Sequence, residues 1–307
     1  MAHRPRWLLV TFALVLLSPC LSGAQARFTY SRGQSVSPAY EGWWPNEDGS
    51  YTLFFGYMNS NWEEEFDIPI GTENAIEPGG PDLGQPTHFY PRRNLFLFKV
   101  VVPADFGDQE LIWTLTTNGR TEVAYGSLRT DYLLDAQTIA TEMGANFGRV
   151  KDEWRTNEPP MLSLAVDQPR SVRVGDPLTL VAFTSDDGIP SGNYTPPAVV
   201  PGKPHPAYRA PSAIVPGNPT GLRFSWIVYR GGASEVSFSP RQLKVWQDTR
   251  VYSHSPWSPP YIMPPVPEDG RWEVEVTFDE PGTYELRAIA GDGALTTSES
   301  LTVTVTR

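Results

Sequence analysis

The sequence predicts an all-β protein that consists of two β-sandwich domains in tandem, joined by a linker with at most one short helix. Apolar and polar residues alternate with a period of two along most of the chain, which places successive side chains on opposite faces of a strand. A helical pattern occurs only from Asp135 to Met143, where Gly144 ends it. A mature chain of about 280 residues is long enough for two cores of ordinary size.

Residues 1–26 have the pattern of a secretory signal peptide. Arg4 and Arg6 precede an apolar run from Trp7 to Leu17, and the small residues that end at Ala26 fit a cleavage site. No later stretch approaches the roughly 18 apolar residues that a membrane helix needs, so no transmembrane segment is expected. Cys20 would be the acceptor in a lipoprotein signal, but Pro19 stands where such signals carry a small residue. We therefore expect a secreted, extracellular or periplasmic protein.

The composition disfavours two classes of partner and excludes one class of site. The formal net charge of −11 becomes −13 when Arg4 and Arg6 leave with the signal peptide. A chain this acidic is not expected to bind nucleic acid or anionic lipid. Because Cys20 is the only cysteine, the mature chain has no disulfide and no thiolate metal site. Secretion without disulfides favours a bacterial origin.

The first domain is expected over residues 27–128. Residues 51–57 and 111–115 alternate with a period of two, and the run 94–102 is apolar enough for a strand that is buried on both faces. Residues 129–160 are expected to form the linker, because Pro159 and Pro160 precede a new series of strands.

The second domain is expected over residues 161–307. Residues 272–278 place apolar side chains on one face and polar side chains on the other, and residues 301–305 repeat this alternation with threonines. Between them, the segment EPGTYELRA carries Glu280, Gly282, Tyr284 and Leu286 in the spacing of Asp-x-Gly-x-Tyr-x-Cys. This segment resembles the tyrosine corner of immunoglobulin-like domains.

Two upstream segments extend this resemblance. GDPLTLVA looks like the second strand of an immunoglobulin-like domain, with Ala182 at a cysteine position, and Trp226 in LRFSWIVYR looks like its core tryptophan. The sequence is more similar to cysteine-free bacterial immunoglobulin-like and PKD-like modules than to antibodies. The resemblance implies that Trp226 packs against Ala182 and Leu286.

Two proline-rich stretches depart from this pattern. One is an insertion over residues 188–221, and the other, SPWSPPYIMPPVP, contains Trp257 and Tyr261. Such stretches favour extended, solvated loops. They are interpreted either as ordered surface loops or as a rim that binds a partner.

The segment 56–93 is the candidate for chemistry, because it gathers several carboxylates and a histidine. A strand over the acidic part would place Glu63, Glu65 and Asp67 on one side, with His88 in the loop that follows. Glycosidases use a pair of carboxylates, so a glycan-active hydrolase is one hypothesis. The other hypothesis is an ordinary solvated strand face followed by turns that Gly, Pro, Asp and Asn form. The run Ile68-Pro69-Ile70-Gly71, with Gly84-Gln85-Pro86-Thr87 further on, also resembles sandwich modules of secreted bacterial surface proteins.

Aromatic side chains that stack on sugars are a second set of candidates. This set consists of Trp43, Trp44, Trp62, Trp257 and Tyr261. Trp43 and Trp44 are consecutive, so on a strand they point to opposite faces and one of them faces solvent or a domain contact.

A calcium site is the third candidate. In the immunoglobulin-like topology, the loops after the second and sixth strands emerge at one end, which would bring Asp186, Asp187 and Asp292 together. Oxygen ligands on loops suit Ca²⁺, whereas ordinary Asp-Gly turns need no metal. No other cofactor is expected.

The sequence therefore predicts a non-enzymatic secreted or cell-surface module, binding or structural, whose ligand is an extracellular protein or a glycan. The alternatives are a carbohydrate-binding accessory protein and a hydrolase that uses Glu63, Glu65 and Asp67.

Overall fold

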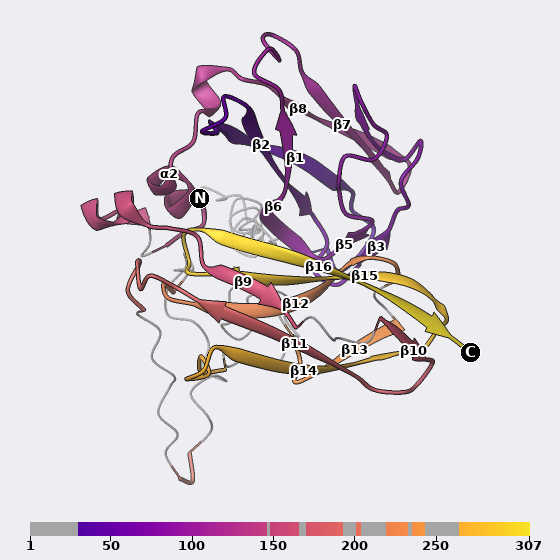
Figure 1. Cartoon of the computed structure of the whole chain (residues 1–307). Helices are drawn as coiled ribbons and strands as arrows, with labels where there is room; N and C mark the ends of the chain where they lie inside the picture. The colour runs from indigo at the N-terminus through magenta and orange to yellow at the C-terminus, as the bar shows by residue number, and fades with distance from the viewer. Residues whose placement is uncertain are drawn as a thin grey trace, which may run out of the picture.

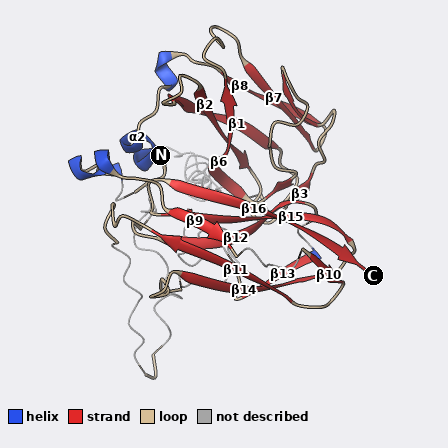
Figure 2. Ribbon diagram, in the orientation of Figure 1, coloured by secondary structure: helices blue, strands red, loops and turns tan. Residues whose placement is uncertain are grey.

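The computed structural model describes two β-rich halves and a connecting segment with the helices (Figures 1 and 2). The described residues are 30–145, 148–165, 170–192, 201–203, 219–232, 235–242 and 264–307. The signal-peptide prediction, Cys20, Trp257 and Tyr261 lie outside these ranges. None of the helices in the described ranges has the length and apolar character needed to cross a membrane.

The first half is a sandwich of two three-stranded antiparallel sheets. One sheet has the order β1 (Val36–Pro45), β2 (Tyr51–Asn59) and β6 (Arg92–Val102), and the other has the order β4 (Asn74–Glu77), β7 (Leu111–Thr117) and β8 (Arg120–Gly126). A short pair, β3 (Phe66–Asp67) with β5 (His88–Phe89), lies beside them. Both sheets contribute to one core, in which Phe55 and Trp113 are fully buried.

Strand β6 contains a bulge that shapes its surface. Phe55 pairs with Phe98 and Tyr57 pairs with Asn94, so three residues of β6 stand opposite the single residue Gly56. Phe96, in the middle of the bulge, has a φ of 48°, in the left-handed region that a side chain disfavours. The bulge turns Phe96 out of the sandwich core and into a second cluster with Leu134 and Ile139.

The second half is an immunoglobulin-like sandwich. One sheet has the order β9 (Met161–Leu164), β11 (Leu178–Ser185), β14 (Arg271–Phe278) and β13 (Val236–Ser239). The other has the order β10 (Ser171–Arg173), β16 (Thr296–Thr306), β15 (Gly282–Gly291) and β12 (Arg223–Arg230). This is the arrangement in which the first strand divides between the two sheets, and β10 pairs with β16 in parallel.

Two side chains confirm the resemblance seen in the sequence. The Tyr284 hydroxyl donates a hydrogen bond of 3.0 Å to the carbonyl oxygen of Glu280, which is the tyrosine corner. Trp226 is completely buried in the same core as Ala182 and Leu286. The all-β, immunoglobulin-like prediction is therefore confirmed.

The connecting segment contains one α-helix, α2 (Ala136–Glu142), and two 3-10 helices, η1 (Thr130–Tyr132) and η3 (Asp152–Thr156). Asp135 caps α2 by accepting a hydrogen bond of 2.7 Å from the Thr138 N–H. The predicted single short helix is thus present. Ile139 packs in a cluster with Phe54 and Leu295, so this segment joins side chains from both halves instead of standing free as a spacer.

Candidate functional site

The two halves meet along strand β12. The first half stands on the sheet that contains β15 and β16 (Figure 1), and its core continues into Ile227, Tyr229 and Ile289 of the second half. Both faces of β12 are buried, and most of its side chains are apolar. The apolar run FSWIVY lacks alternation, and this pattern indicates a strand that is buried on both faces, beyond the core position of Trp226.

A loop of the first half pairs with the edge of β12. The Thr87 N–H donates to the Tyr229 carbonyl over 3.1 Å, and the Val228 N–H donates to the Tyr90 hydroxyl over 2.8 Å. The Tyr229 hydroxyl in turn donates to the carbonyl of Gly84. These bonds satisfy backbone groups that an edge strand otherwise exposes, so β12 is covered at this edge.

An ion pair reinforces this junction. Arg230 at the end of β12 makes a two-pronged contact with Asp82, with N–O distances of 2.9 and 2.7 Å. Both Arg230 and Asp82 are partly exposed, and the hydrogen bond from Arg230 holds the pKa of Asp82 below its ordinary value. The planar guanidinium matches the carboxylate, which gives the contact a defined geometry.

His88 belongs to the same segment as Thr87 and Tyr90 and lies between two carboxylates. Its Nδ1 is 2.8 Å from an oxygen of Asp67 and its Nε2 is 3.0 Å from an oxygen of Glu65, while His88 itself is only 1% exposed. Ionised carboxylates only accept hydrogen bonds, so both contacts are hydrogen bonds at the same time only when the ring is protonated. Burial alone lowers the pKa of His88, but the two carboxylates outweigh burial and raise it.

This arrangement differs from the predicted acidic strand. Only Phe66 and Asp67 form a strand, and pairing with β5 sets Asp67 directly opposite His88. Glu65 and Asp67 both contact the buried His88 while their side chains stay partly exposed, and Glu63 is an exposed residue that does not contact the His88 ring. No pattern of neighbouring residues indicates which residue of the loop pairs with β3, so this contact could not be predicted from the sequence.

The cluster does not have the layout of a glycosidase site. In such a site the two carboxylates flank the sugar bond that is broken, so the space between them must admit substrate. Here the buried His88 ring occupies the space between Glu65 and Asp67. The three groups hold the loop in place.

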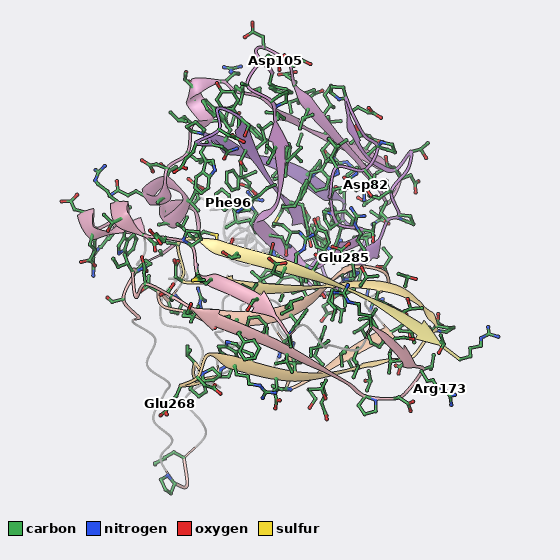
Figure 3. All side chains as sticks on the ribbon, viewed as in Figure 1. Asp82, Phe96, Asp105, Arg173, Glu268 and Glu285 are labelled. Carbon is green, nitrogen blue, oxygen red and sulfur yellow. The ribbon has the colours of Figure 1, made fainter. Side chains whose placement is uncertain are left out.

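A cleft of about 330 Å³ opens at the same junction, between β6 of the first half and β15 and β16 of the second. Phe96 is labelled at this boundary in Figure 3. The cleft is lined by apolar residues, by residues with hydroxyl groups and by two cations. The apolar residues are Phe96, Leu97, Phe98 and Ile289, the hydroxyl residues are Thr296, Thr297, Ser298 and Ser300, and the cations are Lys99 and Arg287. Its size is at the lower end of the range for small-molecule sites.

The two cations of the cleft differ in how they are held. Arg287 stacks on the Tyr229 ring at 3.1 Å and donates to the Leu97 carbonyl, Ser300 and Glu285. Lys99 lies over the Phe54 ring with its ammonium 5.5 Å from the ring centre. Partial desolvation lowers the pKa of Lys99. The cleft is therefore a basic spot on an acidic protein.

The three aspartates of the candidate calcium site lie at one end of the second sandwich. Asp292 is fully buried and accepts two backbone N–H bonds, from Ala294 at 2.6 Å and Leu295 at 2.7 Å. The Asn157 amide also donates to Asp292 over 3.1 Å, and burial raises the pKa of Asp292 to about 6.

The other two aspartates each accept a turn hydrogen bond, and Asp187 also accepts from the Glu158 N–H. The Oδ1 atoms of Asp186 and Asn157 are buried without a hydrogen-bond partner. Within the described ranges, no three His, Cys, Asp or Glu side chains are grouped so as to hold a metal ion. The calcium site stays a prediction.

The three described tryptophans of the candidate glycan set have partners within the chain. Trp43 donates from its indole to the Arg129 carbonyl over 2.9 Å. Trp44 meets the Phe54 ring edge-on at 4.9 Å, and the Arg92 guanidinium lies 4.5 Å from the centre of the Trp62 ring. All three are partly buried.

The sequence matches no protein-family model and no curated protein. Among solved structures, the PKD domain of an M14-like peptidase from a Thermoplasmatales archaeon is 16% identical, with a TM-score of 0.26, and the match covers 50% of this chain and 100% of that one. The Yersinia pseudotuberculosis adhesin InvE is 11% identical, with a TM-score of 0.24, over 90% of this chain and 60% of that one. The immunoglobulin-like assignment rests on the strand order, tyrosine corner and core tryptophan of this chain.

Proposed function

We propose that this protein is a non-enzymatic, secreted or cell-surface binding module in which two sandwiches form one rigid unit. The observation that carries this proposal is the junction along β12. There Glu65 and Asp67, two of the three carboxylates of the hydrolase alternative, contact His88 and support the loop that covers the strand edge. Their role is to fix one half against the other, which presents a preformed surface to a ligand.

The carbohydrate-binding alternative has support from a second feature. The junction cleft combines hydroxyls, aromatic rings and cations, and these groups suit a polar ligand with an apolar face. The candidate tryptophans contribute less to this alternative, because Trp43 and Trp44 already pack within the first half.

A paired substitution separates the module from the hydrolase. Glu65→Gln removes one carboxylate from His88, and we expect a lower melting temperature, because a buried imidazolium loses an ionised partner. Glu110→Gln is the control, since Glu110 is an exposed glutamate that makes no ion pair with a described residue, and it is expected to leave the melting temperature near that of the wild type.

Reducing-end release from soluble polysaccharides is measured on the same three proteins. We expect none from any of them. Wild-type release that Glu65→Gln abolishes, with an unchanged melting temperature, would overturn the proposal and establish the hydrolase. Secretion is checked by expressing the full chain in a bacterial host and determining the mature N-terminus by mass spectrometry, with Arg27 expected.

A further inference from the structure

We propose that the cleft between β6, β15 and β16 binds an acidic monosaccharide unit, such as a uronic acid, through its carboxylate and hydroxyl groups. This inference deepens the proposed function and rests on it, because it names the ligand class of the binding module. Three features of the cleft carry it: a cation without an ionic partner, a second cation held in place, and a row of unused hydroxyls.

Lys99 is the first feature. No carboxylate of the described residues lies within 4.0 Å of its ammonium, although the chain as a whole carries a net charge of −11. Lys99 is exposed on β6, and its ammonium lies 5.5 Å from the centre of the Phe54 ring. A ligand carboxylate would give this accessible cation an ionic partner, and this favours anions over neutral sugars.

Arg287 is the second feature. The Arg287 side chain is only 13% exposed, and its bonds to Leu97, Ser300 and Glu285 use three of its five N–H donors. Stacking on Tyr229 holds the group in one plane. These contacts preorganise the cation, which reduces the entropy lost when a ligand binds.

The hydroxyls and the rings are the third feature. Thr296 and Ser298 line the cleft from the face of β16 that also carries Ser300, opposite Ile289 and Arg287 of β15, and the hydroxyls of Thr296 and Ser298 make no hydrogen bond to another described residue. Hydroxyls both donate and accept, as sugar hydroxyls do. Phe96 contributes to the apolar part of the wall, and the bulge in β6 sets its position before any ligand arrives. A cleft of about 330 Å³ suits one sugar unit.

The test is an NMR titration of ¹⁵N-labelled mature protein with glucuronate, with glucose and acetate as reference ligands. We expect saturable shifts for glucuronate in the amides of residues 96–99 and 296–300. Glucose and acetate at the same concentration are expected to leave these amides unchanged. Lys99→Met keeps the stem of the side chain and removes the charge, and we expect it to weaken glucuronate binding by about tenfold or more.

Lys151→Met is the matched control, because Lys151 lies on the connecting segment and pairs with Glu153 outside the cleft. It is expected to bind glucuronate as the wild type does, and Thr296→Val is expected to weaken binding without unfolding the protein. Acetate or an acidic peptide that binds as tightly as glucuronate would overturn the sugar assignment. Equal affinity of Lys99→Met and the wild type would overturn the site.

The non-enzymatic function and the uronic-acid cleft can fail independently, and the same samples show which of the two has failed. Hydrolysis of a uronic-acid-containing polysaccharide by the wild type would overturn the non-enzymatic function even if the cleft binds glucuronate. Absence of glucuronate shifts without any hydrolysis would overturn the cleft and leave the non-enzymatic function standing.

Discussion

At the scale of single residues, His88 combines burial with charge. Its ring nitrogens lie 2.8 and 3.0 Å from the oxygens of Asp67 and Glu65, both of which are partly exposed. The ring edge also meets Tyr90, whose hydroxyl accepts the Val228 N–H of the second half. The protonation of one buried side chain is therefore connected to the junction of the two halves.

The stability of the protein should fall as the pH rises through the pKa of His88. An unfolded histidine has a pKa of about 6.5, and the two carboxylates raise the pKa of His88 in the folded protein. The folded state therefore binds this proton more tightly than the unfolded state does. The resulting stabilisation is fully present below about pH 6.5 and is lost as the pH rises through the folded pKa.

Urea unfolding between about pH 6.5 and pH 9 measures this effect. His88→Gln is the reference, since it keeps a polar side chain of similar length and does not titrate. Asp292, whose pKa is about 6, titrates in both proteins, so the comparison with His88→Gln removes its contribution. An identical pH dependence in the wild type and His88→Gln would show that His88 does not carry the effect.

Calcium should raise the melting temperature if Asp186, Asp187 and Asp292 bind it. Support for this prediction comes from two buried oxygens without hydrogen-bond partners, on Asp186 and Asn157, near the buried Asp292. Oxygen atoms of this kind suit Ca²⁺. Millimolar calcium is expected to stabilise the wild type, and Asp187→Asn combined with Asp292→Asn is expected to abolish the rise. If the wild type does not respond, the three aspartates act only as turn formers.

At the scale of elements, the two ends of the proline-rich insertion lie against each other. The Thr220 hydroxyl donates to the Ser191 carbonyl over 2.8 Å. A Cβ atom on Gly221, whose φ is +103°, would come within 2.5 Å of the Gly192 Cα atom. This close approach closes the insertion at its base, so the strands β11 and β12 on either side are positioned independently of its length.

Replacement of residues 193–218 by a short Gly-Ser loop should leave the second sandwich folded. Loop length adds little to the free energy of folding, so a change of less than about 1 kcal/mol is expected. Gly221→Ala in the full chain is the contrasting variant and is expected to destabilise the protein, because an alanine side chain would collide with Gly192. Chemical unfolding measures both. An unfolded deletion variant would show that the insertion belongs to the core.

At the scale of the whole molecule, the junction makes one body of two sandwiches. The core of the first half includes Ile227, Tyr229 and Ile289, and Tyr90 packs against the cores of both halves. A contact of this kind, apolar with hydrogen-bonded edges, favours a single cooperative unfolding transition.

Tyr90→Phe should weaken this coupling. It removes the hydroxyl that accepts the Val228 N–H, and an unsatisfied buried donor costs about 1–3 kcal/mol. Tyr125→Phe is the control, since the Tyr125 side chain is 55% exposed and makes no hydrogen bond to a described residue. Calorimetry measures both variants. Equal stability of the two variants would show that the Tyr90 bond does not hold the halves together.

The sequence by itself determined the features that depend on neighbouring residues. Alternation with period two predicted β2, β7, β14 and the second part of β16, because a strand places adjacent side chains on opposite faces wherever it lies. The spacing of Glu280 and Tyr284 predicted a corner that closes within five residues, and the structure contains it. The helix at 136–142 followed from local capping by Asp135.

Only the tertiary structure decided which distant groups meet. Asp82 and Arg230 are 148 positions apart, and Glu65 meets His88 because β3 pairs with β5. The cleft joins β6 to β15 and β16 in the same way. Periodicity shows that a strand has a buried face, but it does not state what covers that face. Shape and charge complementarity between distant segments of the folded chain decide which surface covers a strand, and for this reason the junction along β12 could not be predicted from the sequence.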